Sequence, residues 1–197
     1  MHTAASLQER ESSLSPLILE IINATIGKEG RYANHPSDPG GETMWGIIKT
    51  TAVRHGYIGP MKSLPRDTAV KIYYTEYAVQ PGFAAVAEIS AAIGAELFDS
   101  GVNVGVGRPP IWFQEWLNAF NQRGKLYPDI AEDGIIRPGG ETIRAFQAYL
   151  AKRGAEAEKV MLAALNADQA MRYKTITRAK ETNEDFTFGW IRTRVAA

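Results

Sequence analysis

Apolar residues recur every three or four positions through most of the chain, a spacing that places them on one face of a helix. In the first such stretch, Ser15 and Pro16 form a typical helix start, and the apolar pattern ends near Gly27. The same pattern predicts further helices over residues 64–79, 84–100, 109–122, 140–153 and 155–180. The chain is therefore expected to be mainly α-helical.

Two segments depart from this pattern. Residues 1–13 are polar and are expected to form a flexible N-terminus. Residues 30–48 contain too many glycine, proline and asparagine residues for a helix. The pattern at their end predicts a small β-hairpin near residues 42–48. A mainly α chain with one small β element is thus the indicated fold class.

Composition narrows the classes of function. Lys plus Arg and Asp plus Glu balance at 22 each, so the chain has no overall positive charge that would favour binding to nucleic acid. It has no cysteine, which excludes disulfides, thiolate metal sites and cysteine nucleophiles, and its three histidines are scattered. No apolar stretch is long enough for membrane insertion, and the N-terminus lacks the apolar core of a secretory signal peptide.

The break in the helical pattern carries the candidate chemistry. Glu29 lies just past the first helix, Asp38 follows nine positions later, and Thr43 follows five positions after that. Glycoside hydrolysis needs a carboxylic acid of raised pKa and a second polar group that manages water or the transition state. Desolvation beside the apolar helix would raise the pKa of Glu29. Judged from the residues alone, a solvated glutamate at a helix end is the simpler explanation.

The segment from Glu29 to Ile47 resembles the signature of the glycoside hydrolase family 108 muramidases, the endolysin and secretion-activator group. That signature reads roughly Glu-Gly-Gly-Tyr-x-Asn-x-Pro-x-Asp-x-Gly-Gly-x-Thr-x-x-Gly-Ile. The matching positions in this chain are Glu29, Gly30, Tyr32, Asn34, Pro36, Asp38, Gly40, Gly41, Thr43, Gly46 and Ile47. Arg31 departs from the signature, because it stands where the family usually has a second glycine.

The resemblance covers roughly residues 15–195 and implies a lysozyme-like α+β fold in which helices surround a cleft. It implies a lysozyme-like catalytic region over residues 14–104. It also implies a helical, peptidoglycan-binding-like region over residues 105–197 that packs on the first.

Three details of the later sequence also resemble the family or related wall-binding domains. Asp99 and Asn103 are expected to cap a helix end and brace the cleft. The segment from Asp133 resembles the turn of small peptidoglycan-binding helical domains, with Thr142 as the expected helix N-cap. Trp190, in a Phe-x-x-Gly-Trp ending, is expected to pack the C-terminus onto the body.

The activity that the resemblance implies is that of an N-acetylmuramidase, or lysozyme, which cleaves the β-1,4 bond between N-acetylmuramic acid and N-acetylglucosamine. Glu29 would be the general acid, and Asp38 and Thr43 would hold the attacking water. Phage-type lysozymes have a similar spacing, although Asp38 and Thr43 stand one residue closer here. Asp38 equally fits a structural role in a turn, and the sequence leaves inversion and retention open. Neither a metal nor an organic cofactor is expected, because protonation and cleft electrostatics supply the chemistry.

Aromatic and amide side chains near the signature are candidates for glycan binding, since sugar faces stack on aromatic rings and amides bond N-acetyl groups. The predicted substrate-binding residues are Tyr32, Asn34, Trp45 and Tyr73. For Tyr73, one of several tyrosines at helical spacing, a core position with a satisfied hydroxyl is the alternative. Glu42 is a rival to Asp38 as the second carboxylate.

A muramidase would bind peptidoglycan glycan strands and act on the cell wall, in the periplasm. It would be synthesised in the cytoplasm without a signal peptide and reach the wall through a holin or an export system. Two alternatives stay open. One is a non-catalytic wall-binding or secretion-accessory protein, and the other is a lytic transglycosylase, which can work with one glutamate and yields 1,6-anhydro products.

Overall fold

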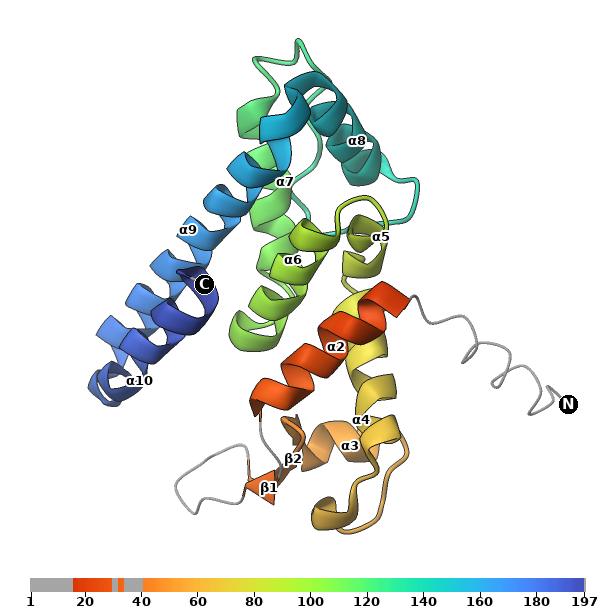
Figure 1. The fold of residues 1–197 in the computed structure, drawn as a ribbon, viewed down its shortest axis with the longest axis vertical. Coiled ribbons are helices and arrows are strands. Elements are labelled where there is room, and N and C mark those ends of the chain that lie inside the picture. The colour runs from red at the N-terminus through yellow and green to blue at the C-terminus, as the bar shows by residue number, and fades with distance from the viewer. Residues whose placement is uncertain (1–15, 30–31, 34–40, 197) are drawn as a thin grey trace, which may run out of the picture. The chain divides into compact units, whose positions relative to one another are not determined.

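The structure is a computed structural model that describes residues 16–29, 32–33 and 41–196, with the backbone alone for residues 27–29 (Figure 1). The chain divides into two compact units, residues 1–78 and residues 79–197. Each unit buries its own set of apolar side chains.

Helices form most of the described part of the first unit and supply most of its core. They are α2 (Pro16–Glu29), α3 (Lys49–Arg54), the 3-10 turn η1 (Met61–Ser63) and α4 (Arg66–Tyr73). α4 continues into the π-helical turn η2 (Tyr74–Val79), whose last residue is the first of the second unit. α2 packs against α4 (Figure 1). Ile18, Ile22 and Ile26 are buried along α2, and Ile72 is buried on α4. The helix predicted from Ser15 to about Gly27 is confirmed as α2, which extends to Glu29.

The first unit also contains a small antiparallel sheet with the strand order β1-β2-β3. Its strands are β1 (Tyr32–Ala33), β2 (Thr43–Met44) and β3 (Ile47–Ile48). Ala33 pairs with Thr43 across the first ladder, and Met44 pairs with Ile47 across the second. The predicted hairpin is therefore confirmed as β2 and β3. The sequence did not predict β1, because a strand of two residues shows no alternation.

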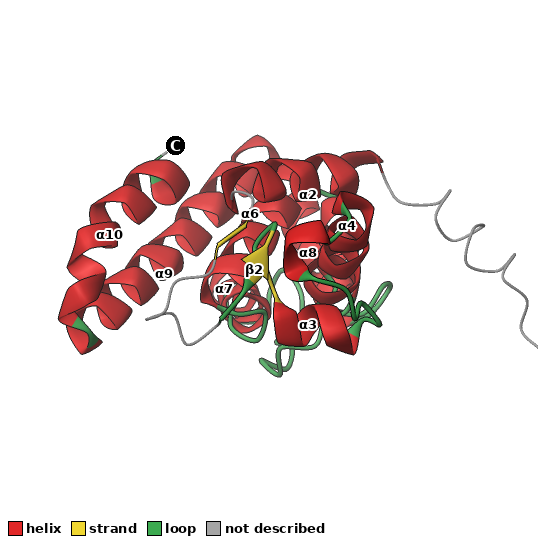
Figure 2. Cartoon of the chain, turned by 90° about the horizontal axis from the view of Figure 1, so that it is seen from below, coloured by secondary structure: helices red, strands yellow, loops and turns green. Residues whose placement is uncertain are grey.

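The second unit consists of helices and loops and has no strand among its described residues (Figure 2). Its helices are α5 (Phe83–Ala87), α6 (Ala91–Val104), α7 (Pro109–Phe120), α8 (Glu141–Arg153), α9 (Ala157–Ala179) and α10 (Glu184–Trp190). Its shorter turns are η3 (Gly154–Glu156), η4 (Glu181–Asn183) and η5 (Ile191–Val195). The long helix α9 contacts α6, α7, α8 and α10, so it is the central element of this unit (Figure 1). Among the helices described, none has both the length and the apolar character that a membrane span requires.

Some helices differ from the prediction. The single helix expected over residues 84–100 is two helices, α5 and α6, separated at Glu88–Ser90. Ser90 caps α6, because its hydroxyl accepts a hydrogen bond from the amide of Ile93 at 3.2 Å. The pattern does not predict α3, which is short and rich in β-branched residues, nor does it predict α10.

The contact between α5 and α6 depends on a glycine. A Cβ atom added at Gly94 would lie 2.4 Å from the Cβ of Ala87, well inside van der Waals contact. On either side of this contact, Phe83 of α5 and Ile93 of α6 are buried. The absence of a side chain at Gly94 therefore sets how closely the two helices pack.

Asp99 connects three elements of the second unit. Its carboxylate accepts hydrogen bonds from Asn103 on α6 at 3.1 Å and from Gln169 on α9 at 3.3 Å. The Nε atom of Arg194, in η5, lies 3.8 Å from the same carboxylate oxygen. Nearby, the ring centroid of Trp190 lies 5.3 Å from that of Tyr173. The expected packing of Trp190 onto the body is thus confirmed within this unit.

Candidate functional site

Glu29 is the last residue of α2, so the backbone places it where the apolar helix gives way to the signature segment. Only Gly30 and Arg31 separate it from Tyr32, where β1 begins. A chain of three residues spans at most about 11 Å, so Glu29 lies close to the start of the sheet. Its side chain is outside the described part of the structure.

Asp38 and Asn34 lie outside the described residues, in the segment that joins β1 to β2. The catalytic role of Asp38 and the substrate-binding role of Asn34 stay predictions. Both ends of this segment are fixed, because Ala33 pairs with Thr43.

Thr43 is the one predicted catalytic residue whose side chain is described. It lies on β2 and is partly exposed. Its hydroxyl is 3.5 Å from the Ala33 carbonyl, at the long limit of a hydrogen bond. A hydroxyl held so weakly can still donate to a water molecule or to a sugar. The sheet therefore joins the strand that follows Glu29 to the strand that carries Thr43.

Polar contacts orient Tyr32 at the edge of the sheet. The Tyr32 hydroxyl donates to Glu42 Oε1 at 3.0 Å, and Lys49 Nζ donates to Glu42 Oε2 at 3.2 Å. The Lys62 ammonium lies 5.0 Å from the centroid of the Tyr32 ring, within the range of a cation–π interaction. Because both its hydroxyl and its ring are held, Tyr32 has a defined position beside Glu29 in the chain.

Glu42 acts in this arrangement as an anchor. The hydrogen bond from Tyr32, and then the one from Lys49, lower the pKa of its carboxyl below the ordinary value. A carboxyl of lowered pKa has no proton to donate near neutral pH, so Glu42 is unsuited to general acid catalysis. Two donors already occupy its oxygens, which argues against Glu42 as the second carboxylate of the site.

Trp45 occupies the two-residue turn between β2 and β3. Its φ is 58° and that of Gly46 is 76°, so both residues have the left-handed conformation that suits a tight hairpin. This conformation is rare for a bulky residue and is held by two hydrogen bonds. The indole Nε1 donates to the Leu64 carbonyl at 3.0 Å, and the Trp45 carbonyl accepts from the Tyr73 hydroxyl at 3.1 Å. Trp45 is partly exposed, and strain held in this way is common at ligand sites.

Tyr73 belongs to the core of the first unit. It is only 1% exposed, and its ring centroid lies 5.3 Å from that of Tyr77. Its hydroxyl donates to Trp45, as described above. Tyr73 thus takes the core position that the sequence left open as the alternative, and its contact with the turn supports Trp45.

An ion-pair cluster between α3 and η2 has no counterpart in the sequence pattern. Glu76 accepts from Arg54 Nη2 at 3.0 Å, and its other oxygen lies 2.7 Å from His55 Nε2. These partners are 22 and 21 positions apart in the chain, so no local pattern links them. No group of three or more metal-ligating side chains comes together within the described ranges, so the cluster is read as an ion pair.

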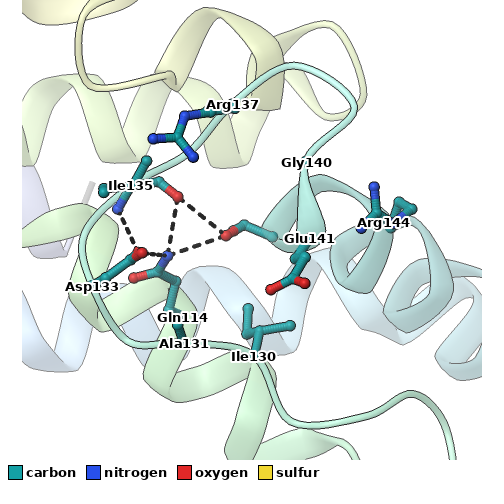
Figure 3. A pocket seen from close by; sticks show the side chains of 10 residues that line it. Gln114, Ile130, Ala131, Asp133, Ile135, Arg137, Gly140, Glu141 and Arg144 are labelled. Carbon is teal, nitrogen blue, oxygen red and sulfur yellow. Dashed lines mark hydrogen bonds between the residues drawn. The ribbon is translucent and has the colours of Figure 1, made fainter.

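In the second unit, the loop before α8 is built around the side chain of Gln114 on α7 (Figure 3). Gln114 is 1% exposed. Its amide nitrogen donates to Asp133 Oδ1 at 3.0 Å, to the Ile135 carbonyl at 3.2 Å and to Thr142 Oγ1 at 3.1 Å. Its amide oxygen accepts from the Gly134 amide at 2.7 Å. One buried amide therefore fixes both ends of the loop.

The predicted role of Thr142 as an N-cap is wrong. α8 begins at Glu141, and Gly140 takes the N-cap position without any side-chain hydrogen bond. The Thr142 hydroxyl is instead a partner of Gln114, because the buried amide competes with the helix end for it.

Comparison with known proteins divides the chain into two regions. Residues 22–105 match the family model described as Glycosyl hydrolase 108, and residues 108–195 match the one described as Predicted Peptidoglycan domain. The chain is also similar to a solved structure described as Brucella abortus SagA, with 22% sequence identity and a TM-score of 0.64. That alignment covers 91% of this chain and 89% of the other. At this level of identity the similarity shows a shared fold alone. No curated protein matches the chain.

The two matched regions do not coincide with the two compact units. α5 and α6 fall within the match to Glycosyl hydrolase 108, which ends at residue 105. In the structure they belong to the unit of residues 79–197, where α6 packs against α7 and α9. The functional boundary predicted near residue 104 stays a prediction.

Proposed function

Since this chain belongs to the glycosyl hydrolase 108 family over residues 22–105 and carries a peptidoglycan domain over residues 108–195, we propose that it is an N-acetylmuramidase. It hydrolyses the β-1,4 bond between N-acetylmuramic acid and N-acetylglucosamine in the cell wall. The observation that carries the proposal is the hydrolase match, which includes the whole segment from Glu29 to Ile47. A holin or an export system is the proposed route by which the enzyme reaches the wall.

In the proposed reaction, the Glu29 carboxyl donates its proton to the glycosidic oxygen as the bond to the anomeric carbon breaks. Asp38 and Thr43 position the water that supplies the hydroxyl of the new reducing end. The position of Glu29 at the end of an apolar helix supports its role, because desolvation there would favour the protonated acid. Thr43 lies on β2, which pairs with the strand that follows Glu29. Its hydroxyl is only weakly held, which supports a contact with water.

Tyr32, Asn34 and Trp45 are the proposed contacts to the glycan. Tyr32 and Trp45 are partly exposed, and each is fixed by hydrogen bonds, so their rings are oriented before a sugar arrives. Preorganised aromatic rings reduce the entropy that binding costs. Tyr73 contributes to this site through its hydrogen bond to Trp45.

The decisive experiment compares wild type, Glu29→Gln and Glu20→Gln in the digestion of purified peptidoglycan, with the fragments identified by mass spectrometry. Glu20 is exposed on the same helix and serves as the matched control. We expect reducing muramic-acid ends from wild type and Glu20→Gln, and none from Glu29→Gln. Turnover by Glu29→Gln near that of wild type would remove Glu29 from the mechanism. Anhydro ends would identify a lytic transglycosylase, and binding to sacculi without cleavage by any variant would identify a wall-binding protein.

A further inference from the structure

The loop that Gln114 organises forms the wall of a pocket of about 380 Å³ in the second unit (Figure 3). The hydrogen-bonded side chains of Gln114 and Thr142 form part of its lining. Because Gln114 is buried and bonded through both its nitrogen and its oxygen, this part of the lining is rigid. The pocket is therefore a preformed feature of the fold.

Charges of both signs line this pocket. Arg137 lies on the loop, and Glu141 and Arg144 lie on the first turn of α8 (Figure 3). Arg144 Nη1 donates to the Gly139 carbonyl at 2.6 Å, which fixes the direction of the guanidinium group. Its other N–H groups remain available to a ligand. Asp133 is less available, because the Ile135 amide and Gln114 already donate to its carboxylate.

Two of these charged side chains are exposed and leave room for a ligand. Among the described residues, the side chains of Arg137 and Glu141 form no hydrogen bond and no ion pair at contact distance, although the charge of Arg137 acts on Asp133. A lone anion in the pocket would meet the repulsion of Glu141, and a lone cation would meet Arg137 and Arg144. Charge complementarity therefore favours a ligand that carries both signs close together.

A second pocket of about 390 Å³ adjoins the first. Ile130, Glu141 and Arg144 line both pockets, so the two lie side by side along α8. The walls of the second pocket include the apolar groups of Leu126 and Ala145. A ligand that extends from the charged pocket into this one would place a small apolar group against these walls.

We propose that the charged pocket binds the zwitterionic end of a diamino dicarboxylic residue in the peptide stems of peptidoglycan. Such a residue joins the peptide through one end and leaves an ammonium and a carboxylate on one carbon at the other. Arg137 and Arg144 bind the carboxylate, Glu141 binds the ammonium, and a neighbouring alanine of the stem occupies the second pocket. This inference rests on the proposed action on peptidoglycan, and it adds recognition of the peptide to cleavage of the glycan.

The test titrates the full-length protein with two glycan-free stem peptides, followed by calorimetry and by NMR. The peptides differ only at the third residue, which is meso-diaminopimelate in one and lysine in the other. Lysine keeps the ammonium but lacks the carboxylate beside it. We expect the diaminopimelate peptide to bind at least about tenfold more tightly, because only its third residue offers the arginines a carboxylate beside the ammonium for charge-assisted hydrogen bonds.

Variants of the pocket complete the test. We expect Arg137→Gln and Glu141→Gln each to weaken binding of the diaminopimelate peptide by about tenfold. Lys152→Gln, which removes an exposed charge from the far end of the same helix, should leave binding unchanged. Equal affinity for the two peptides, no binding of either, or undiminished binding by both pocket variants would overturn the proposal. Neither peptide contains a glycosidic bond, so these outcomes are independent of whether the chain cleaves peptidoglycan.

Discussion

The buried hydroxyl of Tyr73 donates a hydrogen bond to the carbonyl oxygen of Trp45, 3.1 Å away. This bond ties the core of the first unit to the turn of its hairpin. Trp45 has a left-handed backbone that its own side chain disfavours, so its conformation depends on partners elsewhere in the fold. Tyr73 on α4 is one of these partners and Leu64 is another.

Removing this hydroxyl should weaken the turn. We expect Tyr73→Phe to lower the free energy of unfolding by about 1–2 kcal/mol, because the Trp45 carbonyl loses its donor in a partly buried site. Cleavage of peptidoglycan should slow as well, since Trp45 would lose its fixed position. Urea unfolding and the release of reducing ends measure the two effects. Tyr57→Phe is the control, because the Tyr57 hydroxyl donates to Pro60 at an exposed site. Equal stability losses in the two variants would contradict the prediction.

Glu42 should make part of the stability dependent on pH. Its pKa is lowered in the folded state by Tyr32 and then by Lys49, so its ionised form favours folding above the pKa of the unfolded chain. This contribution is lost as the pH falls through the folded-state pKa, below the ordinary glutamate value of about 4.3. The difference in Tm between wild type and Glu42→Gln should therefore be largest at neutral pH and shrink in acid. Glu20→Gln is the control, and a difference independent of pH would count against the assignment.

Gln114 should be important for the stability of the second unit. Gln114→Met keeps the approximate volume but leaves the Gly134 amide and the Thr142 hydroxyl without their partner. We expect a loss on the order of 2–4 kcal/mol, because several buried or partly buried polar groups lose a hydrogen bond together. Hydrogen exchange at Gly134 and Ile135 should accelerate in parallel. Gln147→Met, at an exposed position of α8, should show neither effect. Unchanged exchange at Gly134 would show that the loop does not depend on Gln114.

Two glycines should respond to alanine with opposite signs. Gly94→Ala should destabilise the protein by about 1–3 kcal/mol, because the new Cβ would press on Ala87 and force α5 and α6 apart. Gly189→Ala, inside α10, should stabilise by about 0.5–1 kcal/mol, since nothing lies within 4 Å and alanine favours the helix. Thermal unfolding of both variants tests the pair, and changes of the same sign would refute the packing argument.

The helices were largely predictable from the sequence, because the spacing of nearby apolar residues indicates the buried face of each helix. Ile18, Ile22 and Ile26 predict α2 directly, and Pro109 marks the first turn of α7. The division between α5 and α6 was not predictable by this means. No glycine or proline marks it, and the Ser90 cap becomes evident only once its hydroxyl is seen to accept from Ile93.

The site was less predictable, because its contacts join residues that are distant in the chain. The sequence indicated Tyr32 and Trp45 but not the partners that hold them, since Leu64 and Tyr73 lie 19 and 28 positions from Trp45. Gln114 was missed for the same reason. A glutamine among apolar residues on a helix gives no local sign that its partners lie 19 to 28 positions ahead.

The packing of α6 against α9 has a consequence for how such proteins recombine. By sequence, α6 belongs with the hydrolase region, whereas its buried residues Ile93 and Leu97 share a core with the peptidoglycan domain. A chimera that exchanged the C-terminal region at residue 106 would separate α6 from α9, the helix against which it packs. When such domains are exchanged, the segment from α5 to α9 should therefore come from one parent protein.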